Sequence, residues 1–221
     1  MPTIARTLIV CLVLLTLLYS SAIGQTEAPA KSIATVQAIY GRLRDRLWEI
    51  DDEFWHHGDY ERCIATLRLI TAMDPQSADA YSSGAWLMQN QLRDDEAEVY
   101  LLEGLANNQD IYDLFFDAGY FYYMHERFPE AIDNLEVAVS FGPPVFVWHM
   151  LAHSYEHAGM IPEALGIWSM RESIEPDNLV PVLQIERILA GDPPSAGPEM
   201  ARHSREDRLR EEGRHEAPGH Q

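Results

Sequence analysis

Apolar and polar positions alternate most regularly between Val145 and Asn178. Near the start of this stretch, apolar residues at helical spacing share one face of a single helix: Trp148, Leu151, Ala152 and Tyr155. Gly159 suits the end of that helix, Pro162 the first turn of a second helix, and Pro176 the end of the second. The stretch is therefore predicted to be a helix, a turn and a second helix.

The same arrangement of apolar positions recurs along the chain. Similar stretches follow one another at periods of 34, 34 and 33 residues, counted from their starts at Arg44, Ala78, Tyr112 and Val145. A generic helical bundle with a high apolar content predicts no fixed period. The sequence therefore indicates stacked repeats over residues 44–77, 78–111, 112–144 and 145–178.

This spacing resembles the tetratricopeptide repeat, whose pattern is W-x2-L-G-x2-Y, A-x3-F and P. The resemblance implies an all-α fold, a right-handed α-solenoid of about four helix-turn-helix repeats. In repeat one, Asp51 stands where the pattern has glycine, so we expect looser helix contact at that end. In the last repeat the matching residues are Trp148, Leu151, Ala152, Tyr155, Ala164, Trp168 and Pro176.

A leader over residues 25–43 precedes the repeats. Within it Ile33, Val36 and Tyr40 recur at helical spacing, which predicts a leading helix or an extension of the next helix. Gly41 is either a break between the two or a weak spot in one helix.

Two segments follow the repeats. Residues 179–191 are predicted to form an amphipathic capping helix, which covers the last apolar face and keeps the array from polymerising. Residues 192–221 carry dense charge, four prolines and few bulky apolar side chains, so they are predicted to be a disordered tail.

The first 24 residues have the features of a secretory signal peptide. Arg6 precedes an apolar run, and Ala22 and Gly24 are small residues at minus three and minus one of a cleavage site. Cleavage predicts an exported protein, either periplasmic or secreted. The alternative is an uncleaved membrane anchor over residues 7–24, near the lower length limit for a bilayer span. A membrane is an expected partner only in that case.

Composition and charge exclude several classes of function. Sixteen Lys and Arg against 35 Asp and Glu give a net charge of −19, which repels nucleic acid. The sequence has no phosphate-binding glycine loop and no nucleophile motif, so neither an enzyme nor a bound cofactor is predicted. Cys63 is the one cysteine after the signal segment, which excludes an internal disulfide and favours an inert core position.

In the tetratricopeptide repeat family the first helices of successive repeats line a concave groove. The resemblance implies that the second, fifth, ninth, twelfth and thirteenth positions of each repeat point into it. The predicted groove residues are therefore Asp45, Trp48, Asp52, Trp55, His56, Asp79, Ser82, Trp86, Gln89, Asn90, Asp113, Phe116, Tyr120, Tyr123, Met124, Phe146, His149, His153, Glu156 and His157.

The predicted groove holds no Lys or Arg. Family members that grip a chaperone's terminal carboxylate use Lys, Arg and Asn there, so that function is not expected. An aromatic, mildly acidic groove suits a protein or peptide segment with apolar anchors and basic residues. The sequence thus predicts an exported, noncatalytic binding scaffold. Two alternatives stay open: aromatics that only pack against neighbouring repeats, and self-association through the end repeats.

His149, His153 and His157 form a ladder on one helix face, because residues four apart are neighbours there. One adjacent pair could chelate zinc or another transition metal. Eight residues of helix rise about 12 Å, so the outer two cannot share one ion. We expect neutral histidines that hydrogen-bond in the groove rather than a metal site. A metal carrier or sensor is the alternative function.

Overall fold

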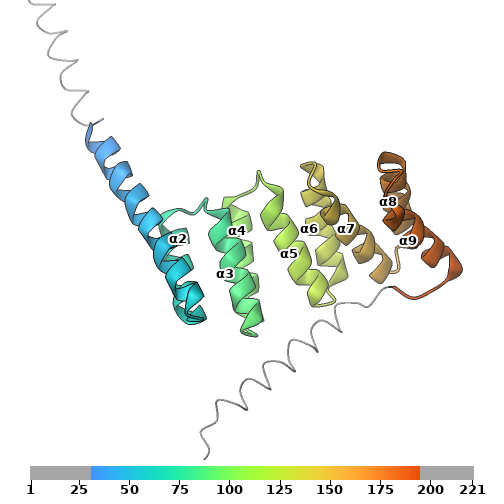
Figure 1. Cartoon of the computed structure of the whole chain (residues 1–221), viewed down its shortest axis with the longest axis horizontal. Coiled ribbons are helices and arrows are strands. Elements are labelled where there is room, and N and C mark those ends of the chain that lie inside the picture. The colour runs from blue at the N-terminus through green and yellow to red at the C-terminus, as the bar shows by residue number, and fades with distance from the viewer. Residues whose placement is uncertain (1–30, 195–221) are drawn as a thin grey trace, which may run out of the picture.

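The computed structural model describes residues 31–194, and every regular element in that range is a helix (Figure 1). The predicted signal peptide or anchor lies outside the described residues, as does the predicted tail from residue 195 onward. Within residues 31–194, no helix combines the length and the hydropathy that crossing a membrane requires.

The first described helix runs without a break over residues 31–56, and we call it the leading helix. The leader is thus an extension of the first helix of repeat one. Gly41 does not interrupt it, because glycine destabilises a helix by only about 0.5–1 kcal/mol. The N-terminal half continues beyond α2 in Figure 1. Its exposed apolar side chains are Ile33, Val36, Ile39, Tyr40 and Leu43.

The leading helix pairs with α2, and three further helix pairs follow before α9 packs on α8. Successive pairs lie side by side, so the described chain forms an all-α solenoid (Figure 1). The helices are α2 (Tyr60–Met73), α3 (Ala78–Asn90), α4 (Asp94–Asn107), α5 (Tyr112–Met124), α6 (Phe128–Ser140), α7 (Val145–His157), α8 (Ile161–Ile174) and α9 (Leu179–Ala190).

Small residues allow the two helices of a pair to approach closely. A Cβ added at Gly84 would lie 2.5 Å from Cε1 of Tyr100, and one added at Gly119 would lie 2.6 Å from Cγ of Leu135. Neither position accepts a larger side chain unless its neighbour moves. One core of buried apolar residues extends from α2 to α8 behind these contacts.

One residue with positive φ sets the turn inside each repeat. Gly58 and Gly159 adopt φ values of 70° and 77° in the first and last repeats, whereas Leu92 and Glu126 adopt 59° and 58° in the middle two. The four positions follow the same period of 34, 34 and 33 residues. A left-handed conformation is unfavourable by about 1–2 kcal/mol for a residue other than glycine. The packed helices on either side must therefore maintain it at Leu92 and Glu126.

Candidate functional site

The leading helix, α3, α5 and α7 are the first helices of the four repeats. α3 contacts α5 and α5 contacts α7, while α4 and α6 lie behind them in Figure 1. We call the surface of these four helices the first-helix face. It corresponds to the groove predicted from the sequence.

A pocket of about 470 Å³ opens between the leading helix, α2, α3 and α5, and we call it the Trp–Asp pocket. Two indole rings stand in its wall: Trp55 is 43% exposed and Trp86 is 51% exposed. Their ring centroids are 5.7 Å apart, at an interplanar angle of 43°. The lining residues are Asp51, Trp55, Leu67, Ser82, Ser83, Trp86, Leu87 and Asp117.

Asp51 stands at a position that small residues fill in the other repeats. Its equivalents are Ala85, Gly119 and Ala152, and all three are buried. Oδ1 of Asp51 is buried too, and it has no hydrogen-bond partner among the described residues. The Cys63 thiol donates to the backbone carbonyl of Asp51, at 3.6 Å, rather than to its carboxyl group. Burial raises the pKa of the Asp51 carboxyl to about 6.

Asp117 brings a second carboxylate to the pocket, from α5. Its Oδ2 accepts a hydrogen bond from the Ser82 hydroxyl of α3. Burial raises the pKa of Asp117 to about 6, and the Asp113 carboxylate also raises it. None of the ion pairs within residues 31–194 includes Asp51 or Asp117. Well above pH 6 the pocket therefore holds two negative charges, and no cation from residues 31–194 pairs with them.

The repeat register places neither Asp51 nor Asp117 in the groove. Asp51 falls at a helix-contact position, and Asp117 lies between two predicted groove positions, Phe116 and Tyr120. One signal for Asp51 was present in the sequence, because a carboxylate at a small core position departs from the repeat pattern. Asp117 becomes recognisable only through its contact with Ser82.

An aromatic strip lies next to the pocket on α5 and α7. Phe116 is half-buried, and its ring centroid lies 6.3 Å from that of the exposed Tyr120 and 5.0 Å from that of Phe146. Trp48, Phe116 and Tyr123 are half-buried and pack against the core, as the packing alternative expects for some aromatics. The exposed acidic members of the predicted groove are Asp45, Asp52, Asp79 and Asp113.

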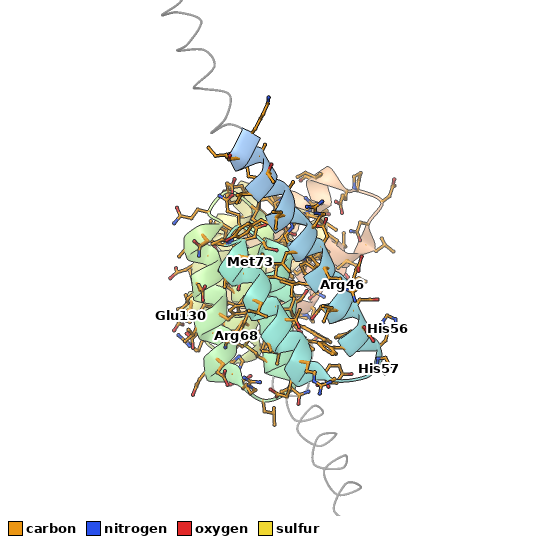
Figure 2. All side chains as sticks on the ribbon, turned by 90° about the vertical axis from the view of Figure 1, so that its left-hand side faces the viewer. Arg46, His56, His57, Arg68, Met73 and Glu130 are labelled. Carbon is orange, nitrogen blue, oxygen red and sulfur yellow. The ribbon has the colours of Figure 1, made fainter. Side chains whose placement is uncertain are left out.

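His56 ends the leading helix and His57 follows it, and both side chains point away from the repeats (Figure 2). Nδ1 of His56 lies 2.8 Å from the carbonyl oxygen of Asp52, and Nδ1 of His57 lies 2.7 Å from that of Glu53. Both imidazoles therefore bond to their own helix. His56 does not line the Trp–Asp pocket, although the repeat register predicted that it points into the groove.

Two predicted groove residues are buried, which differs from the prediction. Gln89 is 8% exposed in the last turn of α3, where Asn90 donates a hydrogen bond to the carbonyl oxygen of Trp86 at 2.9 Å. Glu156 is 6% exposed, because Arg187 of α9 binds both of its carboxylate oxygens. The distances are 2.7 Å from Nη1 to Oε1 and 2.6 Å from Nη2 to Oε2. Neither Gln89 nor Glu156 is free to meet a partner.

Arg187 identifies α9 as a fifth first helix. α9 begins at Leu179, 34 residues after Val145, so Arg187 occupies the ninth position of a fifth unit. Trp86 and Tyr120 occupy the same position in repeats two and three. The groove predicted to lack cations therefore ends at an arginine, whose charge Glu156 balances. The prediction treated residues 179–191 only as a cap, although the 34-residue period continues into them.

The histidine ladder divides between two aromatic surroundings. The ring centroids of His149 and His153 lie 4.9 and 5.2 Å from that of Trp168, whereas His157 stacks on Phe128 at 5.0 Å. Burial lowers the pKa of all three imidazoles, which favours their neutral form at pH 7. In the described part of the chain, no three His, Cys, Asp or Glu side chains are placed to hold one metal ion. The arrangement favours a packing role for the ladder.

Several solved structures resemble this chain. MamA matches with a TM-score of 0.56 and 17% identity, over 66% of this chain and 80% of that chain. Pseudomonas aeruginosa pilF matches with a TM-score of 0.56 and 19% identity, over 69% and 70%. YrrB, a TPR protein with an unusual peptide-binding site, matches with a TM-score of 0.50 and 19% identity, over 60% and 69%. No protein-family model and no curated protein matches the sequence. The likeness confirms the predicted architecture: this chain has the tetratricopeptide-repeat fold.

Proposed function

We propose that this protein is a noncatalytic binding module, which holds a peptide or a segment of another protein on its first-helix face. The Trp–Asp pocket is the observation that carries the proposal. It leaves two indole rings exposed beside two carboxylates. Tryptophan offers a large contact area at low entropy cost, and aromatic anchors in pockets supply most of the energy in many interfaces.

The aromatic strip of Phe116, Tyr120 and Phe146 supports a partner longer than one side chain. An extended or helical segment can place apolar side chains at intervals along such a strip. A peptide-binding site is also described for YrrB, which has the same fold. The partner class is therefore a peptide segment with apolar anchors.

In this proposal, the fate of the N-terminal segment determines the compartment in which the protein binds its partner. A cleaved signal peptide over residues 1–24 would place the binding face in the periplasm or outside the cell, whereas an anchor over residues 7–24 would hold it at a membrane. N-terminal sequencing of the protein from its native cells separates the two. A mature chain that starts at Gln25 supports export, and an intact segment supports the anchor.

The binding face is tested by affinity capture from the native compartment, followed by mass spectrometry. Wild type is compared with a double variant of the first-helix face, Trp86→Ala with Tyr120→Ala. The control truncates two exposed apolar side chains on second helices, Leu69→Ala on α2 with Val99→Ala on α4. We expect the first variant to lose partners that the control retains. If both variants are folded and recover the same partners as wild type, the first-helix face is not the binding surface.

A further inference from the structure

We infer that the Trp–Asp pocket receives one basic side chain of the bound segment, preferably arginine, with its cation beside Asp51 and Asp117 and its stem against Trp55 and Trp86. This inference rests on the proposed function and specifies what the bound segment must carry. Three features of the pocket support it: a carboxylate that the fold does not need, a second carboxylate in the same cavity, and two exposed indole rings.

The Asp51 carboxylate destabilises the folded protein at the position that it occupies. Ala85, Gly119 and Ala152 fill the equivalent positions, so a small side chain meets the packing requirement of this fold. A buried carboxylate oxygen without a hydrogen-bond partner is unfavourable, and Oδ1 of Asp51 is in that state. Within residues 31–194 no cation pairs with this carboxylate. A partner from outside the chain would remove the penalty.

Asp117 brings a second charge into the same cavity. It comes from α5, whereas Asp51 comes from the leading helix, so the two carboxylates line a cavity at the junction of four helices. A cation near both would favour the ionised form of each. The volume of about 470 Å³ is ample for one long side chain, because whole small-molecule sites begin at about 300 Å³.

The two tryptophans favour an organic cation over a metal ion. Hard divalent cations such as Ca²⁺ and Mg²⁺ take about six or more oxygen ligands, and this pocket is lined by indole rings and leucines besides its carboxylates and serine hydroxyls. Indole faces attract guanidinium and ammonium groups and also cover their hydrocarbon stems. Arginine fits better than lysine, because its planar guanidinium can hydrogen-bond to carboxylates and stack on an aromatic ring.

The experiment uses two pools of acetylated, amidated decapeptides, in which one position is fixed and every other position is degenerate but contains no arginine or lysine. The fixed position is arginine in one pool and citrulline in the other, since citrulline keeps the planar shape of the arginine side chain without its charge. Retention of each labelled pool is measured on immobilised full-length protein at pH 7.5. We expect the arginine pool to be retained about tenfold more tightly than the citrulline pool.

The pocket variant is Asp51→Asn with Asp117→Asn. The matched control, Asp133→Asn with Glu172→Gln, removes the same net charge from exposed positions on α6 and α8. The preference for arginine should disappear in the pocket variant and persist in the control. Circular dichroism verifies that both are folded, and Asn should be tolerated because burial disfavours the charge that it replaces.

Equal retention of the two pools by wild type, or a preference for arginine that survives in the pocket variant, overturns the inference. If the pools bind equally but Trp86→Ala with Tyr120→Ala abolishes retention, only the arginine assignment fails and the first-helix face remains the binding surface. If neither pool is retained by wild type above the level of that variant, both the inference and the proposed function fail.

Discussion

At the scale of single residues, Asp117 links the pocket to the stability of the fold. An aspartate in an unfolded chain titrates near pH 3.9, as a typical value. The folded state retains the Asp117 proton up to about pH 6. Between these pH values the folded state binds more protons than the unfolded chain, so the contribution of Asp117 to stability falls as the pH rises. The destabilisation is complete only when the pH is well above about 6.

Asp117→Asn should therefore stabilise the protein at pH 7 by about 1–2 kcal/mol and change little near pH 4, because Asn resembles the protonated acid. Its amide oxygen can still accept the hydrogen bond from Ser82. Urea unfolding at both pH values measures the difference, with the exposed Asp133→Asn on α6 as the control. A gain at pH 4 as large as that at pH 7 would contradict the role of ionisation.

At the scale of elements, α9 is attached to the last repeat by a charge pair inside the protein. The Glu156 side chain is only 4% exposed, and its Arg187 partner is 17% exposed. Arg187 also donates to the carbonyl oxygens of Asp192 and Pro193, at 3.2 and 2.9 Å, which fixes the chain just after the helix. The pair therefore determines how the solenoid ends.

Arg187→Met should destabilise the protein by about 3 kcal/mol, because it leaves the Glu156 carboxylate buried without its partner. The double variant Glu156→Gln with Arg187→Met should recover much of that loss, since it removes the unpaired charge. Urea unfolding measures the stability, and amide hydrogen exchange in α9 measures its attachment. Unchanged exchange of α9 in Arg187→Met would contradict this account.

Glycine positions differ in how a substitution by alanine affects stability, because only some of them lie at a close contact between paired helices. Gly119→Ala should destabilise by about 1–3 kcal/mol, because its Cβ would meet Leu135 and the carbonyl oxygen of Ala131 at 3.3 Å. Gly166→Ala on α8 meets nothing within 4 Å, so it should stabilise by about 0.5–1 kcal/mol. Thermal unfolding of both variants tests the contrast. Equal effects would mean that helix propensity, rather than the contact, governs Gly119.

The repeats were predictable because their local requirements recur with the period: a small residue in repeats two to four, at Ala85, Gly119 and Ala152, and a turn in every repeat. The pocket was less predictable, since it depends on which side chains meet across helices. The contact of Ser82 with Asp117 spans 35 residues, and that of Glu156 with Arg187 spans 31. Periodicity assigns a residue to a face, but it does not identify the neighbour that neutralises its charge.

At the scale of the whole molecule, net charge and exposed apolar surface have opposite effects on self-association. A net charge of −19 attracts basic segments and opposes contact between copies of the chain. Four of the exposed apolar residues of the leading helix fall three, four and three positions apart, which is the spacing of a coiled-coil seam and favours such contact: Ile33, Val36, Tyr40 and Leu43. Salt should thus weaken peptide binding and strengthen self-association.

Self-association, if the leading helix drives it, should appear at high protein concentration and high salt and be lost in Val36→Ser with Leu43→Ser. The control is Leu183→Ser with Leu189→Ser, which changes exposed leucines of α9. Sedimentation velocity at about 10 and about 500 µM resolves the species, since association follows mass action. A single monomeric species under all conditions would exclude the self-assembly alternative.

The unbroken leading helix has a consequence for orientation. At about 1.5 Å per residue, residues 31–56 measure roughly 39 Å, and the same helix carries Trp55 into the pocket near its far end. Whatever holds the chain at residue 31 is thus joined to the pocket by a rigid rod and not by a flexible tether. One residue inserted near Gly41 would turn the attachment by about 100° relative to the pocket. The number of residues in this helix therefore sets the direction in which the pocket faces relative to the attachment at residue 31.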